Sequence, residues 1–207
     1  MGPEWRLTDE SIEHSRRQCL DQFNREQDLW VFAYGSLMWD PAFHFEEIRL
    51  AAIQGYKRRF TLKGEVGRGS PGRPALMLCL EPGDGECVGL AFRVAAARAE
   101  HETSLVWRRE MIRGSYAPLR LNATSPQGPL HVLTFGPNPA HASHVGELPI
   151  DETAEIIANG IGFLGTNREY LEELVRRLDT LAVPDTYLGE LLAQVRVRCR
   201  SNRSKEN

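Results

Sequence analysis

The chain has 207 residues, of which 42% are hydrophobic and 26% are charged, and its formal net charge is -3. That composition is typical of a soluble globular protein, and the slightly acidic balance disfavours nucleic acid or an anionic membrane surface as a partner. No stretch approaches the ~20 apolar residues of a membrane-spanning helix. Met1 to Trp5 lack the basic start and apolar run of a signal peptide, and we expect a cytoplasmic protein.

The first part of the chain combines one helix with several strands. Thr8 can cap a helix whose apolar residues recur at helical spacing. The aromatic and β-branched run 29–34 is typical of a buried strand, and it stops at Gly35-Ser36. Glycine and proline clusters divide the next segment, so further strands are expected at about 48–56, 58–63, 75–81 and 86–95.

The second part of the chain changes from strands to helices. A helix is expected at 96–112, followed by strands at about 116–123 and 130–136. From Pro149 onward the pattern is helical, with a capping box at Thr166 and Glu169 and a last helix at about 185–195. This order predicts a single α+β domain over residues 1–200 with a mostly antiparallel sheet or barrel, and a disordered polar tail at 201–207.

The cysteines and histidines do not form a recognisable metal or disulfide pattern. The four cysteines are widely separated and include no CxxC pair, so we expect free thiols. His141 and His144 have the spacing of paired metal ligands, but no third ligand is near them in the sequence. A serine hydrolase is disfavoured as well, because no GxSxG elbow is present.

Basic residues occur in short clusters along the chain. Each cluster is flanked by acidic or apolar residues, and we interpret them as solvated faces or local ion pairs rather than as a phosphate-binding surface. The clusters are Arg16-Arg17, Lys57-Arg58-Arg59 and Arg108-Arg109.

The segment Tyr34-Gly35-Ser36-Leu37 is the first candidate for chemistry. A strand that runs into Gly-Ser can present consecutive backbone N–H groups at its end, because glycine adopts φ angles that turn them toward one point. Such a nest binds a carboxylate or stabilises an oxyanion. By its local pattern alone, the segment is more typical of an ordinary turn after a strand, since Gly-Ser turns are common.

Glu110 is the second candidate. It lies late in the expected helix, where a carboxylate meets the negative end of the helix dipole. If the side chain is also buried, its pKa should rise toward the range of a general base. The neighbouring Arg108 and Arg109 point in other directions around the helix and need not neutralise it. Taken alone, a glutamate beside two arginines is also typical of a protein surface.

Several segments together resemble the ChaC family of glutathione-specific γ-glutamylcyclotransferases. The stretch from Trp30 to Trp39 carries the family signature YGSL followed by Met-Trp. The similarity continues in order over about residues 29–180. The other matching segments are Gly55 to Phe60, the turn Pro71-Gly72-Arg73, Arg109-Glu110 with Gly114 and Tyr116, and Gly162 to Leu171.

The resemblance implies a β-barrel-like core with helices around it, no metal and no organic cofactor. It implies that Tyr34 to Leu37 hold the γ-glutamyl group and that Glu110 is the catalytic carboxylate. Arg73 and Tyr116 are further candidate substrate contacts, although Tyr116 could be a packing residue and Arg73 an ion-pair partner for its own loop. Ser115 replaces the second glycine of the family's GGY segment, which could alter how closely the backbone approaches the substrate.

The implied reaction is the release of 5-oxoproline and Cys-Gly from glutathione, in which the γ-glutamyl α-amine attacks its own γ-carbonyl. Two alternatives remain open: a cyclotransferase of other γ-glutamyl amino acids or amines, and a non-enzymatic regulator, for example of a cation transporter. The presence of both Tyr34–Leu37 and Glu110 favours an enzyme. We expect a monomer whose partner is a small-molecule substrate.

Overall fold

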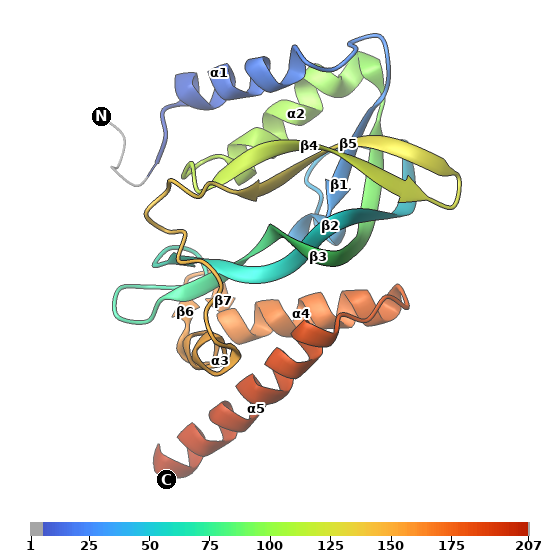
Figure 1. Cartoon of the computed structure of the whole chain (residues 1–207). Coiled ribbons are helices and arrows are strands. Elements are labelled where there is room, and N and C mark those ends of the chain that lie inside the picture. Colours follow the sequence, from blue (N-terminus) through green and yellow to red (C-terminus); the bar gives the residue numbers. More distant parts are fainter. Residues whose placement is uncertain (1–5, 207) are drawn as a thin grey trace. The chain divides into compact units, whose positions relative to one another are not determined.

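The computed structural model describes residues 6–206 (Figure 1). Contacts between residues divide the chain into two compact units. The first unit comprises Met1–Arg58 and Leu80–His141, and the second comprises Arg59–Cys79 and Ala142–Asn207. The single domain expected over residues 1–200 stays a prediction.

Five strands form a closed barrel (Figure 1). The strand order is β1-β3-β2-β4-β5, and the circle closes where β1 pairs with β5 in parallel, with Trp30 opposite Val132. The pairs β1–β3, β2–β4 and β4–β5 are antiparallel. The strands are β1 (Leu29–Ala33), β2 (Glu47–Gly64), β3 (Ala75–Val94), β4 (Tyr116–Ser125) and β5 (Gly128–Pro137). The expected α+β class with a mostly antiparallel barrel is therefore confirmed.

The two longest strands differ from the sequence prediction, which divided each of them in two. β2 and β3 are each continuous, and both contribute residues to the two units. Gly55 and Gly85 have φ angles of 76° and 109°, a conformation that glycine adopts without the penalty a Cβ would bring. Local bends of this kind let a strand change direction within a barrel without ending.

Two helices belong to the first unit, α1 (Asp9–Leu20) and α2 (Ala96–Glu110), and they pack against each other (Figure 1). The predicted cap of α1 is confirmed, because the Thr8 side chain accepts a hydrogen bond from the Ser11 N–H. Arg16 is buried between the helices, where its guanidinium donates to Glu13 and Glu100. The interpretation of this basic cluster as local ion pairs therefore holds for Arg16.

The second unit contains three helices and one short hairpin, of strands β6 (Ile161–Gly162) and β7 (Gly165–Thr166). The predicted capping box is present: Thr166 accepts from the Glu169 N–H, and the Glu169 carboxylate accepts from the Thr166 N–H. Asn167 is fully buried and bonds both backbone groups of Leu76 at 2.8 and 2.9 Å. The helices are α3 (Ile150–Asn159), α4 (Asn167–Thr180) and α5 (Thr186–Glu206).

The last helix is longer than the sequence pattern indicates. α5 continues through residues 201–206, which the sequence analysis assigns to a disordered polar tail. Among the described residues, no helix is long and apolar enough to cross a membrane.

Candidate active site

The segment that follows β1 forms a short 3-10 turn, η1 (Ser36–Met38). The Met38 N–H donates to the Gly35 carbonyl at 2.9 Å, and this geometry leaves the N–H groups of Ser36 and Leu37 without an acceptor inside the turn. Gly35 has a φ of -132°, so the turn does not use the left-handed glycine conformation. The expected set of backbone donors is thus produced by the start of a 3-10 turn.

Tyr34 fixes the position of this turn from inside the barrel. Its side chain is buried, and its hydroxyl donates to the Phe135 carbonyl at 2.7 Å. Its own carbonyl accepts from Nε of Arg58 at 2.8 Å, and the same guanidinium donates to the Val88 carbonyl. Tyr34 therefore anchors the chain immediately before Gly35.

Arg58 was interpreted from the sequence as part of a solvated or ion-paired cluster. The structure corrects the interpretation as a solvated residue, because Arg58 is 4% exposed and donates to main-chain carbonyls. Its long side chain lies within the fold because β2 directs it toward the end of β1. No local sequence pattern distinguishes it from its partly exposed neighbours in the cluster, since both acceptors are distant in sequence.

Glu110 is the last residue of α2, and its side chain is 15% exposed. Burial raises the pKa of the Glu110 carboxyl from an ordinary value of 4.5 to about 7, although the Arg109 guanidinium acts in the opposite direction. A carboxyl group with this pKa exchanges protons readily near neutral pH, which suits a general acid or base. Glu110 lies late in the helix as expected, and its burial raises the pKa in the expected direction.

Arg109 connects Glu110 to the turn after β1. Its Nη2 donates to Oγ of Ser36 at 3.1 Å, and its Nη1 donates to the backbone carbonyl and the carboxylate of Asp40. Its Nε lies 3.4 Å from Oε1 of Glu110. One guanidinium therefore contacts both candidate segments, although the sequence analysis expected Arg109 to point elsewhere.

The chain after Glu110 makes a tight turn into β4. Gly114 has a φ of 69°, which favours glycine. The φ of Ser115 is not positive, so this position does not need a glycine. Asn138 holds the turn, because its N–H donates to the Ser115 carbonyl and its side-chain amide donates to the Gly114 carbonyl. Tyr116 is half-buried at the first position of β4.

Arg73, a candidate substrate contact from the sequence, belongs to the second unit. It closes a turn with Ser70, and its Nε donates to the Asn159 carbonyl at 3.0 Å. Its guanidinium thus bonds to the last residue of α3 rather than to a carboxylate in its own loop.

The structure therefore brings Ser36 and Glu110 together through Arg109, with Tyr34 anchoring the turn. Arg109 and Asp40 are candidate site residues that the sequence analysis missed. The sequence signals for Arg109 were its position next to Glu110 and its place in the Arg109-Glu110 segment that resembles the family. Asp40 gave none, because its contact with Arg109 spans 69 positions along the chain.

Comparison with known proteins identifies the relatives of this chain. It is 36% identical over 172 residues to the glutathione-specific γ-glutamylcyclotransferase of Escherichia coli, an alignment that covers 83% of this chain and 74% of that protein. It is 34% identical over 177 residues to γ-glutamylcyclotransferase 2-1 of Arabidopsis thaliana, covering 81% and 82%.

The fold is also similar to a solved structure, a yeast γ-glutamyl cyclotransferase specific to glutathione. The TM-score is 0.74 at 23% sequence identity, covering 82% of this chain and 96% of the yeast chain. A family model described as ChaC-like protein matches residues 29–198, which include β1, Glu110, α3, α4 and the part of α5 up to residue 198. This chain belongs to the ChaC-like family.

Proposed function

We propose that this protein is a glutathione-specific γ-glutamylcyclotransferase with Glu110 as its acid/base. The observation that carries the proposal is the buried Glu110 carboxyl, with a pKa of about 7, linked through Arg109 to the turn at Ser36. The names of the relatives from Escherichia coli and yeast support glutathione as the substrate.

The substrate carries its own nucleophile, which reduces what the protein must supply. The α-amine of the γ-glutamyl group attacks the γ-carbonyl carbon of the same group, and the amide nitrogen of Cys-Gly leaves. Holding the substrate in a ring-like conformation can be worth an effective molarity of about 10⁵–10⁸ M. The anchored turn at residues 34–37 is suited to this task, because a rigid turn fixes the bound conformation.

Proton transfer is the remaining requirement. The amine must lose a proton before or during attack, and the leaving nitrogen must gain one. Because the pKa of Glu110 is about 7, both protonation states are populated near neutral pH. Glu110 accepts the proton from the attacking amine as a carboxylate and returns it to the leaving nitrogen as a carboxylic acid, a contribution of roughly 10²–10⁴-fold in rate.

The negative charges of the substrate must be met by hydrogen-bond donors. The N–H groups of Ser36 and Leu37 bind the α-carboxylate or the oxyanion that develops at the γ-carbonyl. The Arg109 guanidinium holds Ser36 and Asp40 in place through hydrogen bonds to their side chains. Tyr116 and Arg73 belong to the proposal as weaker substrate contacts.

The biological setting is part of the same proposal: a single-domain monomer in the cytoplasm. The four cysteines are free thiols, three of them buried, which suits a reducing compartment.

The test is to incubate the purified protein with reduced glutathione and to measure 5-oxoproline and Cys-Gly by mass spectrometry. Glu110→Gln keeps the size of the side chain but removes the proton exchange, so turnover should fall by about 10²–10⁴-fold. Glu26→Gln makes the same chemical change at an exposed position and should retain full activity. Normal turnover by Glu110→Gln would exclude the acid/base role. Absence of product from the unaltered protein, including with other γ-glutamyl amino acids, would favour a regulator.

A further inference from the structure

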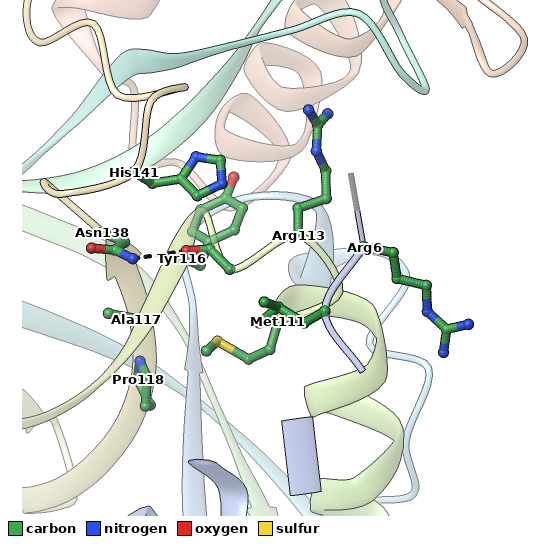
Figure 2. A pocket seen from close by; sticks show the side chains of 10 residues that line it. Arg6, Met111, Arg113, Tyr116, Ala117, Pro118, Asn138 and His141 are labelled. Atoms are coloured by element: carbon green, nitrogen blue, oxygen red, sulfur yellow. Dashed lines mark hydrogen bonds between the residues drawn. The ribbon is translucent and has the colours of Figure 1, made fainter. Parts of the chain in front are cut away.

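A cavity of about 670 Å³ lies in the first unit, next to the end of α2 (Figure 2). It begins one residue after Glu110, because Met111, Arg113 and Gly114 form part of its wall. The start of β4 and the segment after β5 contribute Tyr116 and Asn138. Its volume is within the range of about 300–1,000 Å³ that is typical of small-molecule sites.

The segment before α1 completes this wall. The Leu7 N–H donates to the Ile112 carbonyl at 2.8 Å, and a Cβ on Gly114 would lie 3.1 Å from Cδ1 of Leu7. Arg6 and Leu7 precede residue 29, where the match to the family model begins. The family resemblance therefore assigns no role to Arg6 and Leu7.

The charges around the cavity have one sign. The charged side chains that line it are Arg6 and Arg113, and no aspartate or glutamate of the described chain lines it. Arg6 is neutralised by an ion pair with Asp9. Figure 2 shows Tyr116, Asn138 and His141 on one side of the cavity and Met111, Arg113 and Arg6 on the other.

Arg113 is the cation that remains. Its side chain is half-buried, and within residues 6–206 it has no hydrogen-bond or ion-pair partner. A partly desolvated guanidinium without an acceptor is unfavourable, and an anionic ligand would satisfy it. The fork of N–H groups in arginine matches the two oxygens of a carboxylate.

We propose that this cavity receives the Cys-Gly end of glutathione, and that Arg113 binds the terminal glycine carboxylate. The inference rests on the proposed function, which supplies the substrate, and it adds the residue that recognises the leaving dipeptide. The two residues of Cys-Gly, fully extended, span at most about 7 Å. Arg113 follows Glu110 by only three positions, so its long side chain can bridge a comparable distance from Glu110 to the glycine carboxylate. Leu7 and Met111 provide apolar contact for the cysteinyl group.

The subsite gives a reason for a preference for glutathione over shorter substrates. γ-Glutamylcysteine lacks the terminal glycine, and the C-terminal amide of glutathione lacks the negative charge. The amide would leave Arg113 without an anion in an otherwise filled site, which is an effective way of rejecting a substrate, and γ-glutamylcysteine would place its own carboxylate one residue short of Arg113.

The experiment compares kcat and KM for glutathione and for its C-terminal amide, in the unaltered protein and in Arg113→Gln. The unaltered protein should prefer glutathione by about tenfold in kcat/KM, equivalent to about 1.4 kcal/mol, mainly through KM. Arg113→Gln should lose this preference while its kcat and its activity on the amide stay unchanged. Arg113→Lys should restore part of the preference, since it returns the charge without the fork.

Arg108→Gln is the matched control, because Arg108 is an exposed arginine outside the cavity lining. It should retain the preference for glutathione in full. If the unaltered protein and Arg113→Gln both release 5-oxoproline with the same preference, the subsite is excluded and the proposed function stands. An equal loss on both substrates would mean that Arg113 is structural, which also overturns the subsite. If the unaltered protein releases no 5-oxoproline from glutathione, the proposed function and the subsite fall together.

Discussion

Replacing the proposed acid/base should make the protein more stable while it abolishes turnover. The pKa of Glu110 is about 7 in the folded protein, against an ordinary value of 4.5. Because burial disfavours the charged form, the unfolded chain gives up this proton at lower pH than the folded chain does. The folded state therefore binds more protons between these two values, and the free energy of unfolding falls as pH rises through that range.

The size of the effect follows from the two pKa values. Each pKa unit corresponds to about 1.4 kcal/mol, so the carboxylate destabilises the fold by roughly 3 kcal/mol once the pH exceeds the folded pKa. Part of this penalty is already present at about pH 5. Between about pH 5 and about pH 8, the stability advantage of Glu110→Gln over the unaltered protein should therefore grow by roughly 2–3 kcal/mol.

The assay is urea unfolding of both proteins, followed by circular dichroism at about pH 5, 6, 7 and 8. In thermal unfolding, the same increase corresponds to roughly 4–12 °C for a chain of this size. Glu26→Gln should show no such dependence on pH, because Glu26 is exposed. A stability difference between Glu110→Gln and the unaltered protein that stays constant from about pH 5 to about pH 8 would refute the elevated pKa.

Three further predictions concern Arg109 at the candidate site and two positions elsewhere in the fold. Arg109→Gln should shift the acidic limb of the pH–rate profile to higher pH, because the guanidinium lowers the pKa of Glu110; Asp40→Asn, which keeps the guanidinium, should leave that limb in place. Gly89→Ala should cost about 1–3 kcal/mol in urea unfolding, since its Cβ would lie 2.3 Å from the Ala33 carbonyl oxygen and 2.8 Å from the Phe32 ring; normal stability would contradict this contact. Thr166→Ala should cost about 1 kcal/mol by loss of the cap, measured in the same way, and Thr180→Ala at the other end of α4 serves as its comparison.

Local features were the ones that the sequence could predict. The caps at Thr8 and Thr166 depend on hydrogen bonds to residues three positions away, so a short pattern contains all the required information. The position of Glu110 at the end of α2 and the direction of its pKa shift follow from one helical segment and from burial. The barrel class follows from the order of strands and helices along the chain.

The long strands show why other features could not be predicted. The sequence offers a single glycine at residue 55 and a cluster of proline and glycine at 82–85, and such residues often mark turns. In a barrel, the same glycines can bend a strand that continues, and Gly55 and Gly85 do so. Whether a glycine ends a strand or bends it depends on neighbouring strands that pair from elsewhere in the chain.

Arg58 and Arg109 show the same limit for side chains. Both lie in clusters of basic residues, yet Arg58 is buried against the carbonyls of Tyr34 and Val88. Arg109 contacts Ser36, which is 73 positions away. A long cationic side chain can reach several surfaces, and the chain's topology decides which acceptor it meets.

The position of Arg109 is a compromise between two requirements. Its guanidinium must lie close enough to Glu110 to hold the Ser36 turn beside the carboxyl, and the contact at 3.4 Å meets this requirement. A closer, fully formed ion pair would stabilise the carboxylate and lower its pKa, which would leave a weaker base near neutral pH. Because Arg109 directs its Nη donors to Asp40 and Ser36, burial remains the dominant influence on Glu110. Arg109 can therefore organise the candidate site without neutralising the proposed acid/base.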